Sequence, residues 1–376
     1  MPKGVSAPQA VVIDGAGRVW LTEKLGRNLL RFNPDDGQFT VYPLPEEWGA
    51  VGPSRLAVTR QGEIWFTVRR WVDADSRVSL LGQFIPGPNQ FRLHSLPDGM
   101  VPEDLVVDNQ GVIWFTHPDA NSLQRFNPGD GLLKGYALPT PDAYPRGLTV
   151  DKDGGIWFAE ANVNRVGHFQ PKGETFKEYE LPTPFANPGM VSVDREGRVW
   201  VVEMTANKLG VYYPDWQRFD EVQIPTPRGT PNAVDTDGEG HVWVLEYHGN
   251  RVGHFNPHEA VFREYDIPTY GSLPGNLVVD AERKRLWFTE TSTEARKLGM
   301  LDLQRLPAAV GTPGAAGVVP AAGHGGMGHH MGAAVATPPA AGGGQPDMFR
   351  WWLGGLLGVV VLGVLVRQLR KRRVRT

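Results

Sequence analysis

Residues 148–182 read LTVDKDGGIWFAEANVNRVGHFQPKGETFKEYELP, and this stretch contains four short apolar segments separated by turn-forming residues. The segments 148–151, 156–160, 164–169 and 176–182 are predicted to be β-strands, because the Asp-Gly and Pro-Lys-Gly sequences between them favour tight turns. The third segment alternates apolar and polar residues, whereas the first two are more uniformly apolar, as expected for strands buried on both faces. The stretch is therefore predicted to form a small antiparallel sheet.

The same pattern recurs along the chain at intervals of 43 to 49 residues. One marker is a tryptophan in the second strand, at Trp20, Trp65, Trp114, Trp157, Trp200, Trp243 and Trp287. The other is a proline before the first strand, at Pro8, Pro53, Pro102, Pro145, Pro188, Pro231 and Pro274. A period of about 40–50 residues with a Gly/Trp signature is typical of a β-propeller, in which each repeat forms a four-stranded blade. The sequence predicts an all-β, seven-bladed β-propeller over residues 1–306, with the tryptophans packed between blades.

The seventh repeat is predicted to lack its outer strand. A fourth strand that ends in Leu-Pro or Ile-Pro occurs six times, at Pro45, Pro97, Pro139, Pro182, Pro225 and Pro268, and none follows Trp287. Propellers often close by taking this strand from the N-terminus, but residues 1–7 are too few and too polar to supply it. The hypothesis is that the natural start of the protein lies upstream of Met1.

The composition excludes several kinds of chemistry. The 376 residues include no cysteine, which excludes disulfides, thiolate catalysis and cysteine metal sites. Residues 307–376 contain 7 Lys or Arg and 1 acidic residue, which leaves 31 basic and 40 acidic residues in 1–306, a net charge of -9. Because nucleic-acid backbones attract cations, the acidic propeller is predicted to have no nucleic-acid partner.

The C-terminal part of the sequence predicts a membrane tether. Residues 307–347 are rich in Pro, Gly and Ala and are expected to form a disordered linker. Residues 348–366 are long and apolar enough to span a lipid bilayer as one helix, and the basic tail 367–376 is expected to be cytoplasmic. This orientation places the propeller outside the cytoplasm, so a signal peptide is expected to be missing from this chain. A tail-anchored protein with a cytoplasmic propeller is the alternative.

The linker contains a cluster of imidazole and thioether side chains, namely His324, Met327, His329, His330 and Met331. These soft ligands suit copper better than Mg²⁺ or Ca²⁺. The cluster therefore predicts a copper site, with a low-complexity tract of incidental His and Met as the alternative.

The repeat units resemble those of the virginiamycin B lyase family, also called streptogramin lyases. The matching motifs are Gly-x-Ile-Trp-Phe-Thr/Ala-Glu, Asn-Arg-Val-Gly-His-Phe and Glu-Tyr-x-Leu-Pro-Thr-Pro, at 155–160, 164–169 and 178–184, with close copies at 250–255 and 264–269. The resemblance implies a seven-bladed fold over roughly residues 8–303. It also implies an enzyme that opens a cyclic depsipeptide antibiotic by elimination across its ester bond. The family uses Mg²⁺ or another divalent metal, with histidine and glutamate at the channel mouth.

The sequence departs from the family at this site. The family's lyases carry histidine directly after the repeated proline in the sixth and seventh repeats, and glutamate just before the proline of the seventh. The corresponding residues here are Asn232, Gly275 and Leu273. Proton abstraction needs a positioned base, which Asn and Gly cannot supply. Glu290 matches a further family glutamate, one residue out of register.

Two repeated positions are expected to meet at one face of the propeller, because the first strand starts where the antiparallel second strand ends. Three residues after each tryptophan stand Glu23, Val68, His117, Glu160, Glu203, Glu246 and Glu290. The shared glutamates are either structural or, as Glu160, Glu203, Glu246 and Glu290, ligands of a hard divalent cation such as Mg²⁺. His117 departs from the pattern and is a candidate catalytic residue.

The residue after each repeated proline varies more between blades, which favours a role in ligand recognition. These residues are Gln9, Ser54, Glu103, Arg146, Gly189, Asn232 and Gly275. Gln9, Arg146 and Asn232 are predicted to bind ligand. Glu103 either forms an ion pair with Arg146 or serves as a catalytic base or metal ligand.

Aromatic residues in the loops of this face are predicted to form an apolar wall, namely Trp48, Tyr144, Phe185 and Tyr270, with Trp71 in a long loop of the second repeat. His248 is a candidate polar or catalytic group beside them, whereas His168 and His254 are predicted to be internal blade residues.

Three functions are compatible with these patterns. The favoured one is an extracytoplasmic propeller, anchored in the membrane, that binds a small ligand or divalent metal at the channel mouth. The alternatives are a metal-dependent carbon–oxygen lyase or related hydrolase with a relocated base, and a membrane-tethered scaffold that binds a protein partner.

Overall fold

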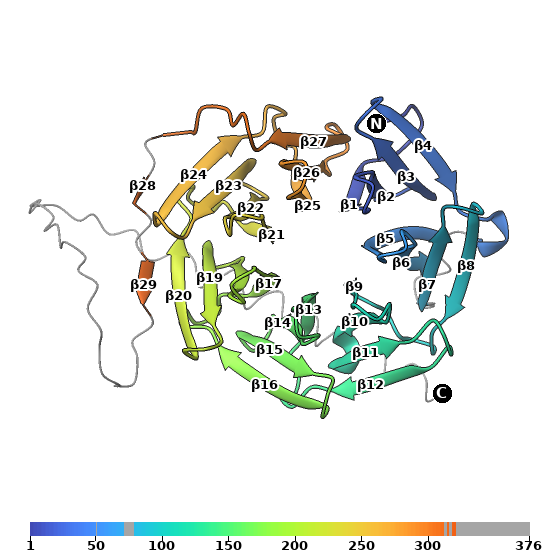
Figure 1. Ribbon diagram of the computed structural model, residues 1–376, viewed down its shortest axis with the longest axis horizontal. Coiled ribbons are helices and arrows are strands. Elements are labelled where there is room, and N and C mark those ends of the chain that lie inside the picture. The colour runs from blue at the N-terminus through green and yellow to red at the C-terminus, as the bar shows by residue number, and fades with distance from the viewer. Residues whose placement is uncertain (50, 71–78, 312–313, 316–317, 321–376) are drawn as a thin grey trace, which may run out of the picture. The chain divides into compact units, whose positions relative to one another are not determined.

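The computed structural model describes residues 1–49, 51–70, 79–311, 314–315 and 318–320. The first compact unit, Met1–His324, consists of seven antiparallel sheets arranged in a ring (Figure 1). The second unit, Gly325–Thr376, lies outside the described residues. The fold prediction of an all-β, seven-bladed propeller is confirmed.

The blades follow one another in chain order. Blade 1 contains β1 (Pro8–Ile13), β2 (Val19–Glu23), β3 (Asn28–Asn33) and β4 (Gln38–Pro43), and is followed by the short helix η1 (Glu46–Trp48). Blade 2 contains β5 (Val51–Val58), β6 (Ile64–Arg70), β7 (Ser79–Ile85) and β8 (Gln90–Ser95). Blade 3 contains β9 (Leu105–Val107), β10 (Ile113–His117), η2 (Pro118–Ala120), β11 (Ser122–Phe126) and β12 (Leu133–Ala137). Blade 4 contains β13 (Pro145–Val150), β14 (Ile156–Glu160), β15 (Arg165–Gln170) and β16 (Thr175–Glu180). Blade 5 contains β17 (Pro188–Val193), β18 (Val199–Glu203), β19 (Lys208–Tyr213) and β20 (Arg218–Gln223). Blade 6 contains β21 (Pro231–Thr236), β22 (Val242–Glu246), β23 (Arg251–Asn256) and β24 (Val261–Asp266). Blade 7 contains β25 (Pro274–Asp280), β26 (Arg285–Glu290) and β27 (Lys297–Asp302).

Each blade is an up-and-down meander with its first strand innermost and its last strand at the rim (Figure 1). The repeated proline is the first residue of the inner strand in five blades and the third in blade 2, and in all six the register shifts within the next two or three residues. Proline has no N–H to donate to the ladder, so it is tolerated at this first, irregular position. Among the described residues blade 7 has three strands, as predicted.

The seven repeated tryptophans are at most 5% exposed and pack against the neighbouring blade. Trp20 lies 5.8 Å from Phe84 of blade 2, measured between ring centroids, and Trp114 lies 5.7 Å from Phe169 of blade 4. The predicted role of the tryptophans in packing between blades is confirmed. Burying such large rings excludes water along each interface and contributes about 2 kcal/mol or more per side chain.

An aspartate six residues before the tryptophan holds the indole in five blades. In blade 4 the indole Nε1 of Trp157 donates to Asp151 Oδ2 at 3.0 Å, and Asp151 Oδ1 accepts the N–H groups of Asp153 and Gly155. The same hydrogen bond, donated by the indole and accepted by the aspartate, recurs at Asp14, Asp108, Asp194 and Asp237. One carboxylate therefore closes the turn between the first two strands and satisfies a buried indole N–H.

Blade 7 closes the ring by packing face to face against blade 1. Trp287 shares a buried cluster with Val11, Val19 and Leu21, and Val5 of the N-terminal segment joins this cluster. The N–H of Val11 donates to Asn276 Oδ1 at 2.9 Å. The N-terminal residues thus pack at the closure without adding a strand to blade 7.

Two short strands follow blade 7 within the segment that was expected to be a linker. β28 (Gly314–Ala315) pairs with β24 of blade 6, and β29 (Val318–Pro320) pairs with β20 of blade 5. The N–H of Val310 donates to the carbonyl of Glu264, which leads the chain back toward blade 6. The sequence analysis did not expect these strands. Across the part of the chain that the structure describes, no helix has the length and apolarity to cross a membrane. The expected spanning segment 348–366, the basic tail and the His/Met cluster lie outside that part.

Candidate functional site at the channel mouth

One face of the propeller collects the starts of the inner strands and the ends of the second strands, and we call it the mouth. Pro145 is the register partner of Glu160, and Pro188 that of Glu203. The loops that join second to third strands and one blade to the next also lie at this face. The opposite face, called the far face, holds the tight turns within each blade. The predicted meeting of the two repeated positions is confirmed.

Residues after the repeated proline connect neighbouring blades across the inner edge. Gln9 Nε2 donates to Ser54 Oγ at 3.1 Å, which joins blades 1 and 2. Asn232 Nδ2 donates to the carbonyls of Pro274 at 2.9 Å and Gly275 at 3.2 Å, which joins blades 6 and 7. These bonds fix the orientation of the Asn232 amide, and its Oδ1 is left buried without a hydrogen bond from another described residue.

Glu103 and Arg146 make separate contacts. Glu103 Oε1 lies 3.9 Å from Arg55 of blade 2, and both side chains are partly exposed. The Arg146 guanidinium lies 5.5 Å from the ring of Tyr144 and 3.6 Å from Met204 Sδ. Neither contact neutralises Arg146, so a cation is available at this point of the mouth. The alternative in which Glu103 pairs with Arg146 is not the arrangement seen.

Asp104 is a carboxyl group that the sequence analysis missed. It is 7% exposed, and burial raises its pKa to about 6. The nearby Arg55 opposes this effect, the charge of Glu103 adds to it, and the backbone N–H groups of Leu105 and Leu148 donate to the carboxylate. A carboxyl group with this pKa exchanges its proton near neutral pH, which suits a general acid or base.

The shared glutamates of blades 4, 5 and 6 form buried carboxyl pairs, of which Glu203 with Glu221 is an example. Glu221 accepts hydrogen bonds from the N–H and Oγ1 of Thr183 and from Lys208 Nζ, at 2.6 to 2.8 Å. Both oxygens of Glu203 are buried and receive no such donors. A charge on Glu203 would therefore be buried without a donor among the described residues, so this carboxyl takes a proton.

The pKa values of three glutamates follow from this environment. Burial, followed by the charge of the neighbouring glutamate, raises the pKa of Glu160, Glu203 and Glu246 to about 8. The partner glutamates of blades 4 and 6 are held in the same way as Glu221. Glu178 accepts hydrogen bonds from Thr140 and Arg165, and Glu264 accepts them from Thr226 and Arg251. A carboxylic acid that is protonated at neutral pH donates a hydrogen bond and is a poor metal ligand.

Glu23 and Glu290 occupy the same position with different partners. Glu23 accepts the N–H and Oγ of Ser6, at 3.1 and 3.0 Å, so it bonds a loop amide as the structural alternative predicted. Glu290 pairs in register with Lys297.

The four glutamates predicted as metal ligands belong to four separate sheets. Within residues 1–49, 51–70, 79–311, 314–315 and 318–320, no three His, Asp or Glu side chains gather in a way that could hold a metal. Mg²⁺ binding stays a prediction, and no step is assigned to it.

The two candidate histidines lie in different surroundings. His117 is 6% exposed, neither ring nitrogen makes a hydrogen bond of ordinary geometry, and burial lowers its pKa. The Gly99 backbone and Asp119 oppose this shift in part. His248 is exposed and its Nδ1 lies 3.0 Å from Thr230 Oγ1. His117 belongs to blade 3 and His248 to the loop after β22, so they are not brought together.

The aromatic wall is only partly present. Tyr270 is 99% exposed and Phe185 87% exposed, in loops that enter the mouth. Tyr144 is half-buried, and Trp48 is buried in the core between blades 1 and 2 rather than lining the mouth. Trp71 lies outside the described residues.

Two histidines were predicted to be internal blade residues. His168 stacks on Trp157 and His254 stacks on Trp243, with ring centroids 4.1 and 4.2 Å apart. That prediction is confirmed.

The positions where the family carries its histidines are occupied by groups that cannot take a proton. Asn232 is bonded to two carbonyls, as described above, and Gly275 has no side chain. A Cβ added to Gly275 would lie 2.4 Å from Thr291 Cγ2, so this position has no room for a larger residue without a shift of Thr291. Leu273, which replaces the family glutamate, adopts a left-handed backbone conformation with φ of 49°.

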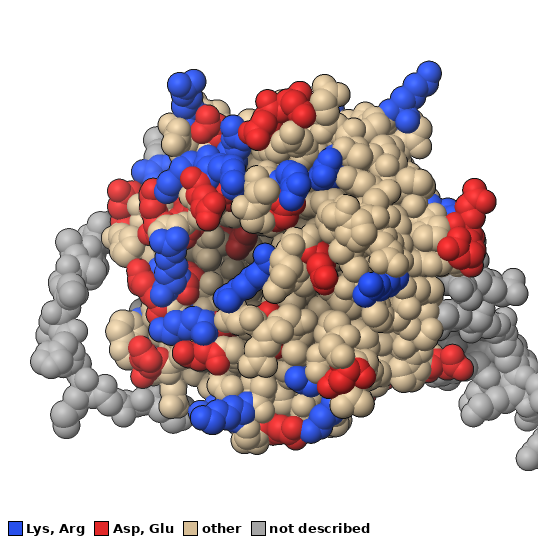
Figure 2. Space-filling view, turned by 45° about the vertical axis from the view of Figure 1, so that its right-hand side comes forward, with Lys and Arg blue, Asp and Glu red and all other residues tan. Residues whose placement is uncertain are grey.

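Charges on the face drawn in Figure 2 are mixed: acidic and basic side chains are interspersed around a hollow, and neither sign forms a continuous patch.

The ring of seven blades and the loops gathered at its mouth define a β-propeller with a potential ligand site at its channel. The model of the virginiamycin B lyase family matches residues 1–299, and the chain therefore belongs to the virginiamycin B lyase family. A search of curated protein sequences finds no match.

Solved structures with the same fold include two of virginiamycin B lyase from Staphylococcus aureus, each 26% identical to this chain. The selenomethionine-substituted enzyme gives a TM-score of 0.68 over 78% of this chain and 94% of that one. A catalytically inactive histidine-to-alanine variant, crystallised with quinupristin, gives a TM-score of 0.70 over 80% of this chain and 96% of that one. A streptogramin B lyase structure, 24% identical, gives a TM-score of 0.69 over 77% of this chain and 93% of that one, which shows the likeness of fold.

Proposed function

We propose that this chain is a binding member of the virginiamycin B lyase family, whose mouth holds a cyclic peptide ligand of the streptogramin B class without opening it. The observation that carries the proposal is the arrangement at Asn232 and Gly275. Asn232 presents a buried acceptor that no other described residue satisfies, and Gly275 leaves no space for a base without a shift of Thr291. Buried acceptors normally have a partner, so Asn232 Oδ1 is suited to receive an N–H or O–H from a ligand.

Binding and turnover are separable in this fold. The inactive S. aureus variant, which lacks one histidine, was crystallised with quinupristin. The present chain has no histidine at either corresponding position. Arg146 supplies a cation that no described carboxylate pairs with, and Tyr144 and the exposed Tyr270 supply apolar surface for a peptide ring. Such a few polar groups on an apolar wall are typical of small-molecule sites.

Calorimetric titration of the full chain with quinupristin tests the proposal. Asn232→Ala is expected to weaken binding roughly tenfold, because it removes one buried acceptor worth about 1–1.5 kcal/mol. Asn33→Ala, in a far-face turn of blade 1, is the matched control and is expected to bind like the wild type. Equal affinity of the Asn232→Ala variant and the wild type would contradict the assigned role, and the absence of binding by the wild type would contradict the ligand class.

A carbon–oxygen lyase with a relocated base is the second candidate, and Asp104 is the observation that favours it. Its raised pKa, beside Glu103 and Arg55, is the property expected of a general base at the mouth. This alternative predicts ring opening that is abolished by Asp104→Asn and by Glu103→Gln. Chromatography of the antibiotic distinguishes the two candidates, because elimination changes its retention but not its mass.

We further propose that the propeller is tethered outside the cytoplasm by residues 348–366 and that the cluster at 324–331 binds copper. The support is the sequence pattern alone. Protease protection of the basic tail in sealed membrane vesicles tests the orientation, and copper titration of a synthetic peptide covering 320–335 tests the metal site.

A further inference from the structure

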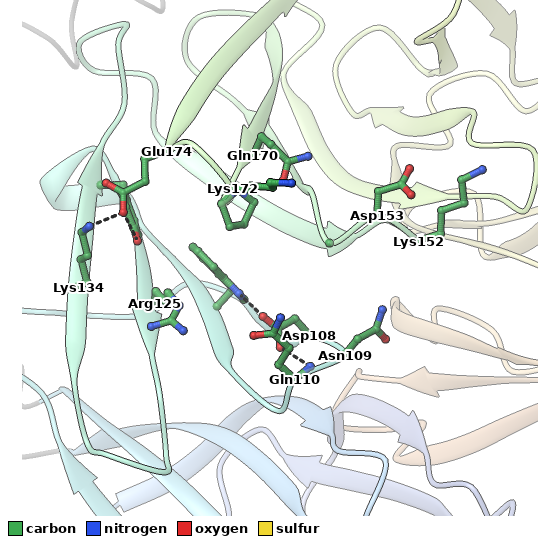
Figure 3. Close-up of a pocket in the computed structure, with 14 residues that line it drawn as sticks. Asp108, Asn109, Gln110, Arg125, Lys134, Lys152, Asp153, Gln170, Lys172 and Glu174 are labelled. Atoms are coloured by element: carbon green, nitrogen blue, oxygen red, sulfur yellow. Dashed lines mark hydrogen bonds and ion pairs between the residues drawn. The ribbon is translucent and has the colours of Figure 1, made fainter.

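A cavity of about 730 Å³ opens on the far face, between blades 3 and 4 (Figure 3). It is lined by the first turn and outer strands of blade 3 and by two turns of blade 4, at Lys152–Gly154 and Gln170–Glu174. The mouth residues described above belong to the opposite ends of these strands. The cavity is therefore a second site, independent of the proposed function.

The wall of the cavity on the blade 3 side is aromatic. Trp114 and Tyr136 both line it, and their rings stack with centroids 5.9 Å apart at 25°. Trp114 is fixed by the bond from its Nε1 to Asp108 Oδ2, at 2.9 Å. Trp114 is 1% exposed and supports Tyr136 from the core, so the partly exposed Tyr136 ring is the apolar surface that the cavity offers to a ligand.

Arg125 lies beside this wall, and no described residue compensates its charge. It is the register partner of Trp114, it is half-buried, and it makes no hydrogen bond or ion pair with another residue that the structure describes. The corresponding residue of blade 1, Arg31, lies 5.8 Å from the Trp20 ring and donates to Thr40. In blade 3 the cross-strand partner of Arg125 is Lys134, a second cation, where blade 1 has Thr40.

The other charges of the lining leave a positive excess. Glu174 forms an ion pair with Lys134 and accepts from Tyr136 at 3.5 Å, and Asp108 is occupied by Trp114 and by backbone N–H groups. Lys152 and Lys172 project from the turns of blade 4 at the rim, where Figure 3 shows them with Asp153. The free groups are thus three cations, Arg125 included, and one carboxylate.

A hydrogen-bonded bridge between first turns, found at three other interfaces, is absent from the described residues of this one. Arg60 donates to Asn109 between blades 2 and 3, Arg195 to the carbonyl of Gly238 between blades 5 and 6, and Lys284 to Glu239 between blades 6 and 7. Asn109 and Lys152 stand at the equivalent places of blades 3 and 4, and among the described residues no hydrogen bond joins their two turns. The Lys134–Glu174 pair closes only the outer edge.

We propose that this cavity binds a small molecule that carries an oxyanion, a carboxylate or a phosphate, next to a flat apolar group. The guanidinium of Arg125 has the planar fork that pairs with two oxygens of such an anion. The flat group packs against Tyr136, which Trp114 holds in place, and Lys152 and Lys172 add attraction at the rim.

The proposal is tested by calorimetric titration of the full chain with phenyl phosphate and with 3-phenylpropionate, and with benzyl alcohol as a neutral probe. At least one of the two anions is expected to bind with a dissociation constant in the millimolar range or below, and roughly tenfold tighter than benzyl alcohol, because a charge-assisted pair contributes that much. Whichever anion binds tighter identifies the preferred oxyanion.

Variants locate the site. Arg125→Gln is expected to weaken anion binding roughly tenfold, and Arg125→Lys, which keeps the charge but not the fork, to give an intermediate loss. Arg92→Gln, on an exposed strand of blade 2, is the control and is expected to bind as the wild type does. Thermal unfolding of all three variants shows whether they fold. Equal binding by folded Arg125→Gln, equal affinity for benzyl alcohol, or no binding of either anion would each overturn the proposal. Quinupristin binding at the mouth is expected to be unchanged in Arg125→Gln.

Discussion

Replacing Glu203 by glutamine should remove a defined part of the pH dependence of stability. In the fold this carboxyl has a pKa of about 8, raised by burial and by Glu221, whereas its ordinary value is 4.5. The folded chain therefore keeps a proton that the unfolded chain releases between pH 4.5 and 8. Stability from this group is fully present below pH 4.5 and is lost as pH rises through 8.

The magnitude follows from proton linkage. One proton bound only by the folded state changes the free energy of unfolding by about 1.4 kcal/mol per pH unit. Between pH 5.5 and 7.5 the wild type should lose about 2 kcal/mol through Glu203 alone. Glutamine has nearly the same shape and cannot ionise, so the Glu203→Gln variant should lose about 2 kcal/mol less over the same interval.

Urea unfolding at pH 5.5, 6.5 and 7.5, followed by tryptophan fluorescence, measures this difference. Glu282→Gln is the control, because that side chain is 84% exposed in a far-face turn and should leave the pH dependence as it is. If Glu203→Gln showed the full wild-type loss between pH 5.5 and 7.5, Glu203 would be ionised in the fold and the account of the carboxyl pairs would be refuted.

Two further changes test the scaffold and the mouth. Asp194→Ala should destabilise the protein by about 3 kcal/mol or more, because it leaves the indole N–H of Trp200 and the guanidinium of Arg198 without their buried partner. Chemical denaturation measures the free energy of unfolding of the variant. A loss below about 1 kcal/mol would contradict the role of the repeated aspartate. Gly275→His should lower the melting temperature and gain no lyase activity, because its Cβ would meet Thr291 at 2.4 Å. Thermal unfolding measures the stability of this variant and product chromatography its activity. A variant that is both stable and active would show that the mouth accepts the family's base.

Much of the fold could be predicted because its determinants repeat. The period of the tryptophans and prolines sets the number of blades, and the absence of a Leu-Pro ending after Trp287 predicts a three-stranded seventh blade. The stacking of His168 and His254 inside blades follows from their place in alternating third strands.

Other features had a signal that the sequence analysis did not use. An aspartate stands six residues before five of the tryptophans, and a second glutamate follows Glu160, Glu203 and Glu246 at a constant distance in the fourth strand. Both patterns concern pairs of residues on different strands, so their meaning appears only when the register is known.

The remaining features depend on geometry that no local pattern records. The far-face cavity lies between two turns that are 43 residues apart in sequence and that no hydrogen bond joins among the described residues. The pKa of Asp104 depends on burial by two neighbouring blades. β28 and β29 are short and lie in a Pro/Gly/Ala-rich segment, so strand propensity does not identify them; they form because β24 and β20 offer unpaired edges.

The most direct test of the proposed function is to incubate the full chain at high concentration with quinupristin and Mg²⁺ and to follow both the bound and the free antibiotic by chromatography. The account predicts that quinupristin is retained by the protein and is recovered with its ring intact. Recovery of a linear product of unchanged mass would contradict it and would show that a base such as Asp104 has replaced the missing histidines.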